Sequence, residues 1–268
     1  LIYDIKPDFI INLAAQSHVR VSFDQPVYTA TVNAIGPLRI LEAIRRINPK
    51  IRFYQASSSE MFGLHSPPQN EMTPMWPSSP YGAAKLAAYH MTRQYRLGYG
   101  MFASNGILFN HESERRGKTF VTAKIAHGVA KIKLGKEKEL VLGNLDAKRD
   151  WGHSADYMRA IYNIMNHDVA DDFCVATGEY YSVKDFVIKA FDYYDMDWKE
   201  FVKFSDKYTR PVEVPALLGD PTKIKSVLKW EPKVSFDQLV KGMLDSALEE
   251  EQAGHVIIKP FDWEAIGE

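Results

Sequence analysis

The chain has 268 residues, of which 46% are hydrophobic and 25% are charged, so it can bury a substantial core as one large domain or a domain with a lobe. Its net charge is −1 and its acidic and basic residues are interspersed, which argues against a nucleic-acid partner or a basic membrane-binding surface. The single cysteine, Cys174, excludes a disulfide within the chain. Because no apolar run could span a bilayer and no leading signal segment is present, we expect a cytoplasmic protein.

Apolar runs alternate with helical patterns along the chain, as a doubly wound parallel α/β sheet requires. The helix that opens at Ser182 has Asp185 in a capping arrangement, and the Asp220–Pro221 pair is typical of a helix start. We predict strands at 8–13, 51–56, 101–109, 139–142 and 173–176, and helices at 27–47, 81–97, 119–134, 154–166, from 182, at 220–228 and at 235–250.

Tyr81 and Lys85 are four residues apart in a predicted helix, so they share one face about one turn apart. The lysine ammonium can lower the pKa of the phenol, which is near ~10 when unperturbed, and can hold a ribose hydroxyl. With fourteen tyrosines in the chain, about one Tyr-x-x-x-Lys is expected by chance. Taken alone, the pair is equally explained by an amphipathic helix with an exposed lysine.

The position of two further residues supports a catalytic role for this pair. Ser58 and Glu60 fall just past the strand at 51–56, at the carboxyl end where parallel α/β sheets bind ligands. Pro80 places Tyr81 in the first turn of its helix, near the same edge. Serine, carboxylate, phenol and ammonium can therefore meet in one cleft, although a serine cluster alone would favour a solvated turn.

Several longer motifs resemble the extended short-chain dehydrogenase/reductases and, among them, the GDP-mannose 4,6-dehydratase family. The resemblance covers most of the chain from Pro7 to about Glu250. Sister epimerases share Tyr-x-x-x-Lys but usually lack a glutamate after the serine pair, and glucose-type dehydratases usually have Asp-Glu there. The motifs are NLAAQSHVRVSF at 12–23, QASSSEMFG at 55–63, SPYGAAK at 79–85, GILFNHESERRGKTFVTAKI at 106–125, LGNLDAKRDWGH at 142–153 and RPVEVPALLGDPTK at 210–223.

The chain departs from the family pattern at its start. The family opens with a strand and a glycine-rich turn that binds the dinucleotide pyrophosphate, whereas the first glycine here is Gly36 and no such motif occurs. We therefore expect a fragment without the first strands and helices. The expected organisation is the remainder of an NADP-binding Rossmann domain at 1–110, a mainly substrate-binding lobe at 111–252 with segments that return to the Rossmann domain, and an unassigned tail at 253–268.

The resemblance implies that the protein removes water from GDP-mannose to give GDP-4-keto-6-deoxymannose. Tyr81 would take the proton of the C4 hydroxyl while a nicotinamide accepts the C4 hydride, and Ser58 would bind the same oxygen. Glu60 would remove the C5 proton and return it to the departing C6 hydroxyl. The family more often has threonine at the Ser58 position, and we expect activity to survive that difference. The implied catalytic residues are Ser58, Glu60, Tyr81 and Lys85.

The resemblance also implies NADP as cofactor, since the planar guanidinium of Arg116 suits a phosphate-bearing ligand. No metal is expected. The implied partners are GDP-mannose and further copies of the chain, in a homodimer or homotetramer built partly through the Arg115 loop. The cofactor-binding residues would be Leu13, Ala14, Ala15, Gln16, Ser17, Tyr28, Lys85, His111 and Arg116. The substrate-binding residues would be Asn110, Lys124, Arg149, Arg210 and Glu213.

Other interpretations stay open at this point. Lys124 could be an exposed helix lysine, Arg149 a surface partner of Asp150, and His111 an ordinary loop histidine. The protein could be an epimerase or a dehydratase for another nucleotide sugar, in which Glu60 performs no elimination. It could also be a truncated, non-catalytic nucleotide-binding subunit, as the missing glycine-rich turn suggests.

Overall fold

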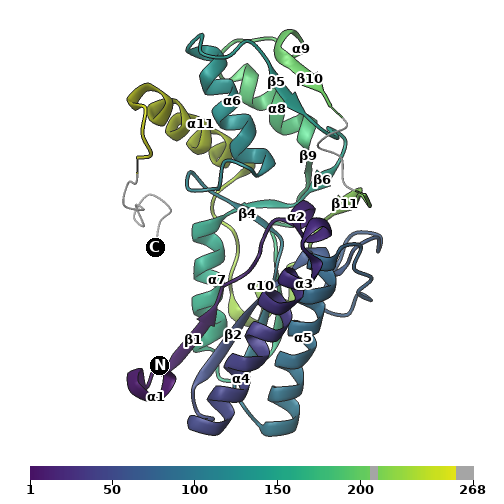
Figure 1. Ribbon diagram of the computed structural model, residues 1–268, viewed down its shortest axis with the longest axis vertical. Helices are drawn as coiled ribbons and strands as arrows, with labels where there is room; N and C mark the ends of the chain where they lie inside the picture. Colours follow the sequence, from purple (N-terminus) through teal and green to yellow (C-terminus); the bar gives the residue numbers. More distant parts are fainter. Residues whose placement is uncertain (206–210, 258–268) are drawn as a thin grey trace.

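The computed structural model describes residues 1–205 and 211–257 and shows a sheet with helices below a smaller helical part (Figure 1). The helices are α1 Ile2–Ile5, α2 Val19–Asp24, α3 Pro26–Ala30, α4 Gly36–Ile47, α5 Pro80–Tyr99, α6 Val121–Lys133, α7 Ser154–Asn166, α8 Val183–Asp192, α9 Trp198–Phe201, α10 Thr222–Leu228 and α11 Phe236–Ala253. The strands are β1 Phe9–Asn12, β2 Arg52–Ser58, β3 Ala103–Leu108, β4 Asn110–Glu112, β5 Leu140–Leu142, β6 Lys148–Arg149, β7 Trp151–His153, β8 Asp172–Val175, β9 Tyr181–Ser182, β10 Val202–Phe204 and β11 Ala216–Leu217.

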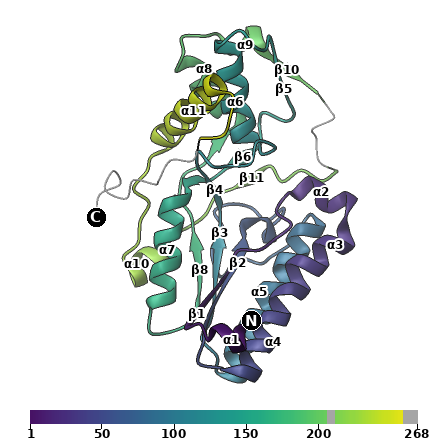
Figure 2. The same ribbon diagram turned by 60° about the vertical axis from the view of Figure 1, so that its left-hand side comes forward.

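The main sheet has four strands in the order β1-β2-β3-β8, and all of its neighbouring pairs are parallel. Helices α4 and α5 cover one face, and α7 and α10 cover the other (Figure 2). Consecutive residues of a strand point to opposite faces, so Phe53 packs with α4 and α5 whereas Tyr54 packs with α7. The expected doubly wound α/β fold is confirmed, and the predicted strands and helices are present with shifted ends and one interruption.

Two predicted helices differ from the structure. The stretch 27–47 is interrupted by a π-helical turn, Thr31–Ile35, between α3 and α4. Pro37 has no N–H to donate to the carbonyl four residues back, which explains why the regular ladder breaks before it. Helix α10 begins at Thr222, two residues later than expected, although Asp220 still accepts a hydrogen bond from the Thr222 N–H at 3.0 Å.

The upper part of the molecule has its own core between α6, α8 and α11. The Trp151 ring stacks on Phe236 at 6.0 Å and meets the edge of Phe186 at 5.7 Å. Capping boxes at Ser182 and Ser235 start α8 and α11, as the sequence indicates for Ser182. From the second half of the chain, α7, β8 and α10 return to the main sheet.

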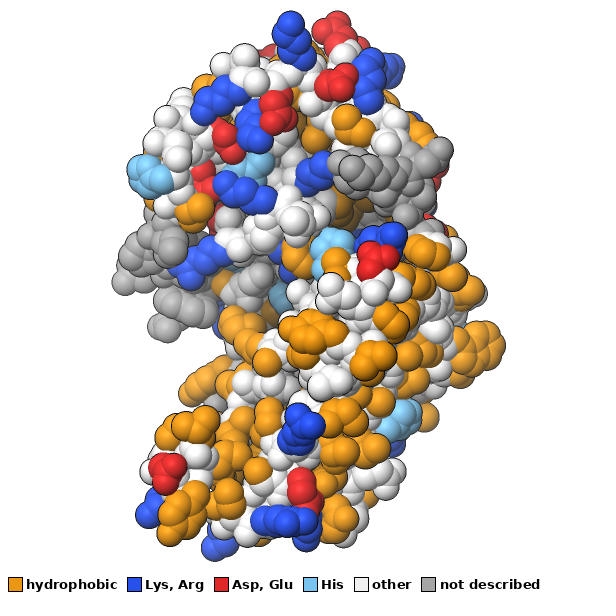
Figure 3. Space-filling model, in the orientation of Figure 1, with side chains coloured by type: hydrophobic (Ala, Val, Ile, Leu, Met, Phe, Trp, Pro, Cys, Tyr) orange, Lys and Arg blue, Asp and Glu red, His pale blue; other side chains and the backbone are white. Residues whose placement is uncertain are grey.

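The two parts differ at the surface. Hydrophobic side chains gather over the lower part in Figure 3, and charged ones over the upper part. No helix within residues 1–205 and 211–257 is both long and apolar enough to cross a membrane. The exposed apolar side chains on α3, the turn after it, α4 and α5 are Val27, Tyr28, Ile35, Ile47, Met91, Leu97 and Tyr99.

Candidate active site

A cavity of about 410 Å³ opens where the carboxyl ends of β1, β2 and β3 face the upper part of the molecule. Most of the residues expected from the sequence converge there, although they come from widely separated segments. Those that line the cavity are Leu13, Ala15, Ser17, Ser58, Glu60, Tyr81, Lys85, Asn110, His111, Arg116, Lys124, Arg149 and Glu213.

Ser58 and Glu60 enter the cavity because β2 ends in a short 3₁₀ turn, Ser59–Met61. The Ser58 hydroxyl caps this turn by accepting a hydrogen bond from the Glu60 N–H at 3.2 Å. Gly82 allows the start of α5 to approach closely, since a Cβ there would lie 2.6 Å from the Glu60 carbonyl oxygen. The helix that carries Tyr81 therefore begins against the turn that carries Glu60.

Tyr81 and Lys85 lie in the first turns of α5, which has Pro80 at its start, as the sequence predicts. The Ser79 hydroxyl caps the helix by accepting a hydrogen bond from the Gly82 N–H. Lys85 Nζ donates to the Ala56 carbonyl at 2.9 Å and lies 5.8 Å from the centre of the Tyr81 ring. Burial lowers the pKa of Lys85 to about 8. Burial also raises the pKa of Tyr81 to about 12, against which a hydrogen bond from Ser58 acts in the opposite direction.

His111 forms another wall of the cavity on β4, which pairs in parallel with β7. Its ring stacks on Tyr157 at 5.0 Å, and its Nδ1–H donates to the Phe109 carbonyl at 2.9 Å. Burial lowers the pKa of His111 to about 4, so the ring is neutral at pH 7. Its Nε2 atom is then a hydrogen-bond acceptor.

Glu112 also lines the cavity, although its residue type and position in the sequence do not predict this. Its Oε2 atom lies 2.9 Å from Arg116 Nε and accepts a hydrogen bond from the Thr122 hydroxyl at 2.7 Å. The Arg116 guanidinium lies 3.6 Å above the centre of the Phe120 ring. Glu112 therefore fixes a cation at the cavity wall. Its only sequence signal is its place inside the NHESERRG motif.

Arg149 and Lys124 face the cavity from the upper part of the molecule. The Arg149 Nη1 atom donates to the Val214 carbonyl at 2.9 Å, and Nη2 lies 3.4 Å from Glu213 Oε1. Arg149 is 6% exposed and Asp150 is fully buried, so the alternative of a surface pair is wrong. Asp150 instead accepts hydrogen bonds from Thr177, Gly178 and Gly219, while burial raises its pKa to about 6.

Comparison with known proteins decides the family. A family model described as GDP-mannose 4,6 dehydratase matches residues 1–243. The chain belongs to this family. It is 51% identical to GDP-mannose 4,6 dehydratase 1 of Arabidopsis thaliana over 249 residues, which cover 91% of this chain and 69% of the relative. It is 48% identical to the human GDP-mannose 4,6 dehydratase over 270 residues, with 93% and 72% coverage.

The fold is that of a wider group. RMD from Pseudomonas aeruginosa, solved in complex with NADPH, superimposes with a TM-score of 0.84 at 24% sequence identity. The match covers 91% of this chain and 82% of that one. This member of the GDP-mannose 4,6-dehydratase family therefore has the Rossmann-type architecture that the sequence resemblance implies.

Three described residues expected at the site of this GDP-mannose 4,6-dehydratase family member do not line the cavity. Ala14 lies beside it, between two residues that do. The Gln16 side chain donates to the His18 carbonyl at 3.0 Å and accepts from the Thr29 hydroxyl at 3.3 Å. Tyr28 is 57% exposed on α3. Arg210 lies outside the described residues.

The buried ammonium of Lys85 is expected to reduce the stability of the fold. Its folded-state pKa of about 8 lies below the ordinary 10.5, so the unfolded chain binds the proton more tightly, and stability falls as the pH drops from 10.5 through 8. At about 1.4 kcal/mol per pKa unit the penalty below pH 8 is about 3 kcal/mol. Lys85→Met should therefore raise the free energy of unfolding at pH 7 by about 2 kcal/mol after loss of the bond to Ala56.

Urea unfolding at pH 7 and pH 10 checks this prediction. The gain of Lys85→Met should shrink at pH 10, where wild-type Lys85 has already lost its proton in the folded state. Lys50→Met, which removes an exposed lysine, should leave stability unchanged at both pH values. No gain for Lys85→Met at pH 7 would show that Lys85 is not destabilised by burial.

Proposed function

We propose that this chain dehydrates GDP-mannose to GDP-4-keto-6-deoxymannose. The observation that carries the proposal is a carboxylate, Glu60, in the same cavity as Ser58, Tyr81 and Lys85. A phenol and an ammonium suffice to move hydride to and from C4, as an epimerase requires. Elimination of water across C5 and C6 needs an additional group that removes one proton and delivers another, and Glu60 supplies it.

The residues of the cavity fit a nicotinamide cofactor, and we propose NADP. The Lys85 ammonium has three donors, and within the described part of the chain its hydrogen bond goes to the Ala56 carbonyl, so two donors remain for ribose hydroxyls. After β1, the chain presents its backbone and the small side chain of Ala15 to the cavity, so a dinucleotide could approach closely there. The guanidinium of Arg116 suits a phosphate-bearing dinucleotide. When bound, NADP would accept the hydride from C4 and release it to C6.

The chain's own residues move the protons. Tyr81 takes the proton of the C4 hydroxyl, and Ser58 donates a hydrogen bond to the same oxygen. The resulting C4 ketone acidifies the C5 hydrogen, which Glu60 removes and passes to the departing C6 hydroxyl, so that water leaves. In the last step hydride adds to C6 and a proton adds to C5. Because Tyr81 took one proton from the C4 hydroxyl in the first step, the number of protons balances over the whole reaction.

The diphosphate would lie against the cations of the upper part of the molecule. Lys124 and Arg149 reach the cavity from α6 and β6, and Arg210 is proposed as a third cation. Glu213 holds the Arg149 guanidinium at 3.4 Å and so orients it toward the cavity. Asn110, the first residue of β4, is proposed to bind the sugar.

The exposed apolar surface on α3, α4 and α5 supports a homodimer or homotetramer. We propose that the exposed Arg115 contributes to a second contact between copies and that the enzyme acts in the cytoplasm. Light scattering on the purified protein measures the oligomeric state. A monomer at micromolar concentration would contradict this part of the proposal.

The direct test is the mass of the sugar nucleotide after GDP-mannose is incubated with NADP and the protein expressed from its complete open reading frame. Loss of one water from GDP-mannose establishes the dehydratase. An unchanged mass together with a changed sugar configuration would identify an epimerase. No change of either kind with any nucleotide sugar would leave a binding role.

A further inference from the structure

Four buried polar side chains cross the main sheet in a single row, one on each strand. The row consists of Asn12, Gln55, Asn105 and Asp172, which are direct register partners from β1 to β8. Their exposed fractions are 6%, 1%, 0% and 5%. Asn12 Nδ2 donates to Gln55 Oε1 at 2.8 Å. Parallel sheets covered on both faces normally bury apolar side chains, so a polar row of this kind needs an explanation.

Asn105 connects this row to helix α5 and to the end of β2. Its Nδ2 atom donates to Asp172 Oδ1 at 2.8 Å and to the Tyr89 carbonyl of α5 at 3.3 Å. Its Oδ1 atom accepts from the Ser57 hydroxyl at 3.0 Å. Because a carboxylate can only accept, Asp172 dictates which end of the amide faces it, and the other end must face Ser57.

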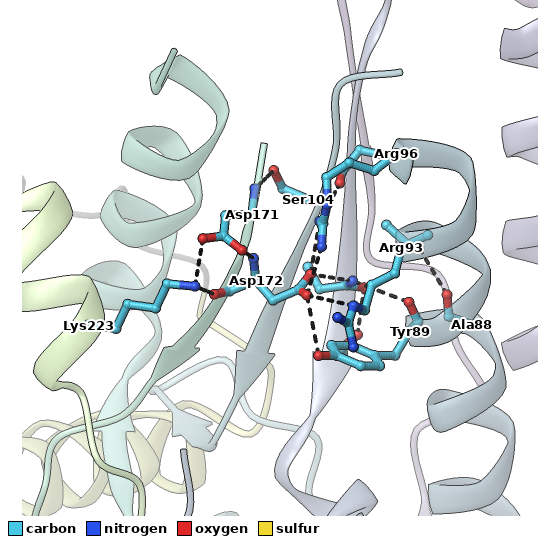
Figure 4. A network of polar contacts seen from close by, with 12 residues as sticks. Ala88, Tyr89, Arg93, Arg96, Ser104, Asp171, Asp172 and Lys223 are labelled. Carbon is cyan, nitrogen blue, oxygen red and sulfur yellow. Dashed lines mark hydrogen bonds and ion pairs between the residues drawn. The ribbon is translucent and has the colours of Figure 1, made fainter. Parts of the chain in front are cut away.

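Asp172 holds the same helix from the edge of the sheet (Figure 4). Arg96 binds its two oxygens at 3.0 and 2.8 Å, and the Tyr89 hydroxyl donates to Oδ2 at 3.3 Å. Arg93 Nε lies 3.3 Å from the same oxygen, and Lys223 Nζ donates to the Asp172 carbonyl at 2.8 Å. All of these side chains are anchored to α5 or to elements that pack on the sheet, so the helix cannot slide without breaking several charged contacts.

The contacts of Asn105 lie next to the proposed catalytic groups. Tyr89 follows Lys85 by one turn and Tyr81 by two turns on the same face of α5, about 6 and 12 Å along the axis. Ser57 immediately precedes Ser58 on β2, and Lys85 itself binds the Ala56 carbonyl of that strand. Asn105 therefore holds the helix that carries the phenol and the strand that carries the serine at the same time.

We infer that Asn105, oriented by Asp172, is a positioning residue that sets the axial position of α5 on β2 and thereby the placement of Tyr81 against Ser58 and Glu60. Asn105 does not line the cavity. The inference rests on the proposed dehydratase function. A displacement of about 1 Å between catalytic groups lowers rates by up to about 100-fold. The contacts that Asn105 makes to α5 and β2 are therefore expected to affect the rate of catalysis.

The test compares three variants in the full-length protein with GDP-mannose and NADP. Asn105→Leu replaces the amide with an apolar side chain of similar size. Ser57→Ala removes the link to β2, at a residue that also lines the cavity. Tyr95→Phe is the matched control, because it removes a 2.9 Å hydrogen bond from the same helix to Glu42 on α4. For each variant, kcat and KM are measured per folded molecule, with the folded fraction taken from an unfolding curve.

A positioning role predicts that kcat per folded molecule falls about 10- to 100-fold in Asn105→Leu and about threefold or more in Ser57→Ala, with KM for GDP-mannose changed less than about twofold. Tyr95→Phe should keep the wild-type kcat. Wild-type kcat per folded molecule in Asn105→Leu would overturn the inference, and if that variant does not fold, wild-type kcat in Ser57→Ala would do so. A wild-type protein that fails to dehydrate GDP-mannose overturns the proposed function instead, so the two failures are distinguishable.

Discussion

A Glu60→Gln variant is expected to lose dehydration of GDP-mannose by about 1,000-fold while it still oxidises the sugar at C4. The amide keeps the size of the carboxylate but can neither remove the C5 proton nor deliver one to the C6 oxygen. Tyr81, Lys85 and Ser58 are unchanged, and the hydrogen bond from the residue 60 N–H to the Ser58 hydroxyl is retained because it comes from the backbone. Hydride should therefore still move reversibly between C4 and the cofactor.

Two measurements on Glu60→Gln separate these steps. Mass spectrometry of the sugar nucleotide reports loss of water, and the absorbance of reduced nicotinamide reports oxidation at C4. Glu71→Gln makes the same change of charge outside the cavity, at a carboxylate that accepts a hydrogen bond from the Cys174 N–H at 2.6 Å, and it should keep full activity. If Glu60→Gln retains more than about a tenth of the wild-type rate, another group performs the elimination and the assignment of Glu60 fails.

The part of the site that could be predicted from the sequence depends on local signals. A buried strand followed by Ser58 and Glu60 locates them at the carboxyl edge of a parallel sheet. Pro80 indicates the start of α5, so the direction of Tyr81 follows from the helix geometry alone. These features need only short segments of chain, and their backbone arrangement is the one that the sequence indicates.

The remaining features depend on how distant segments pair. Asn12, Gln55 and Asn105 lie in separate strands with no sequence signal that links them, and only the register of the strands aligns them into a row with Asp172. The side chains that follow β1 could not be predicted for a different reason. Ser17 lines the cavity whereas Gln16 turns to its neighbours, a difference set by local hydrogen bonds that the motif does not reveal.

A Tyr81→Phe variant is expected to lose both dehydration and oxidation at C4, with kcat lower by about 1,000-fold. Without its phenol oxygen, the residue cannot take the C4 hydroxyl proton, so hydride cannot leave. Burial raises the pKa of this phenol to about 12, and the cation of Lys85 and the positive charge of oxidised nicotinamide would have to lower it on binding. Because the working form of Tyr81 is deprotonated, wild-type kcat should rise with pH up to about 8, where Lys85 begins to lose its proton, and the residual rate of the variant should not.

Tyr54→Phe provides the matched control for this experiment. It makes the same chemical change on the opposite face of the sheet, at a buried hydroxyl that has no hydrogen-bond partner among the described residues, so activity should be unchanged. KM for GDP-mannose in Tyr81→Phe should stay within about threefold of wild type, since Lys124 and Arg149 lie on other elements. Reduced nicotinamide that forms at the wild-type rate in Tyr81→Phe would assign the C4 proton to another base. If reduced nicotinamide fails to form in Tyr81→Phe but still forms in Glu60→Gln, Tyr81 acts in the oxidation at C4 and Glu60 acts in the later elimination of water. Only a group that is needed before the elimination can block the oxidation.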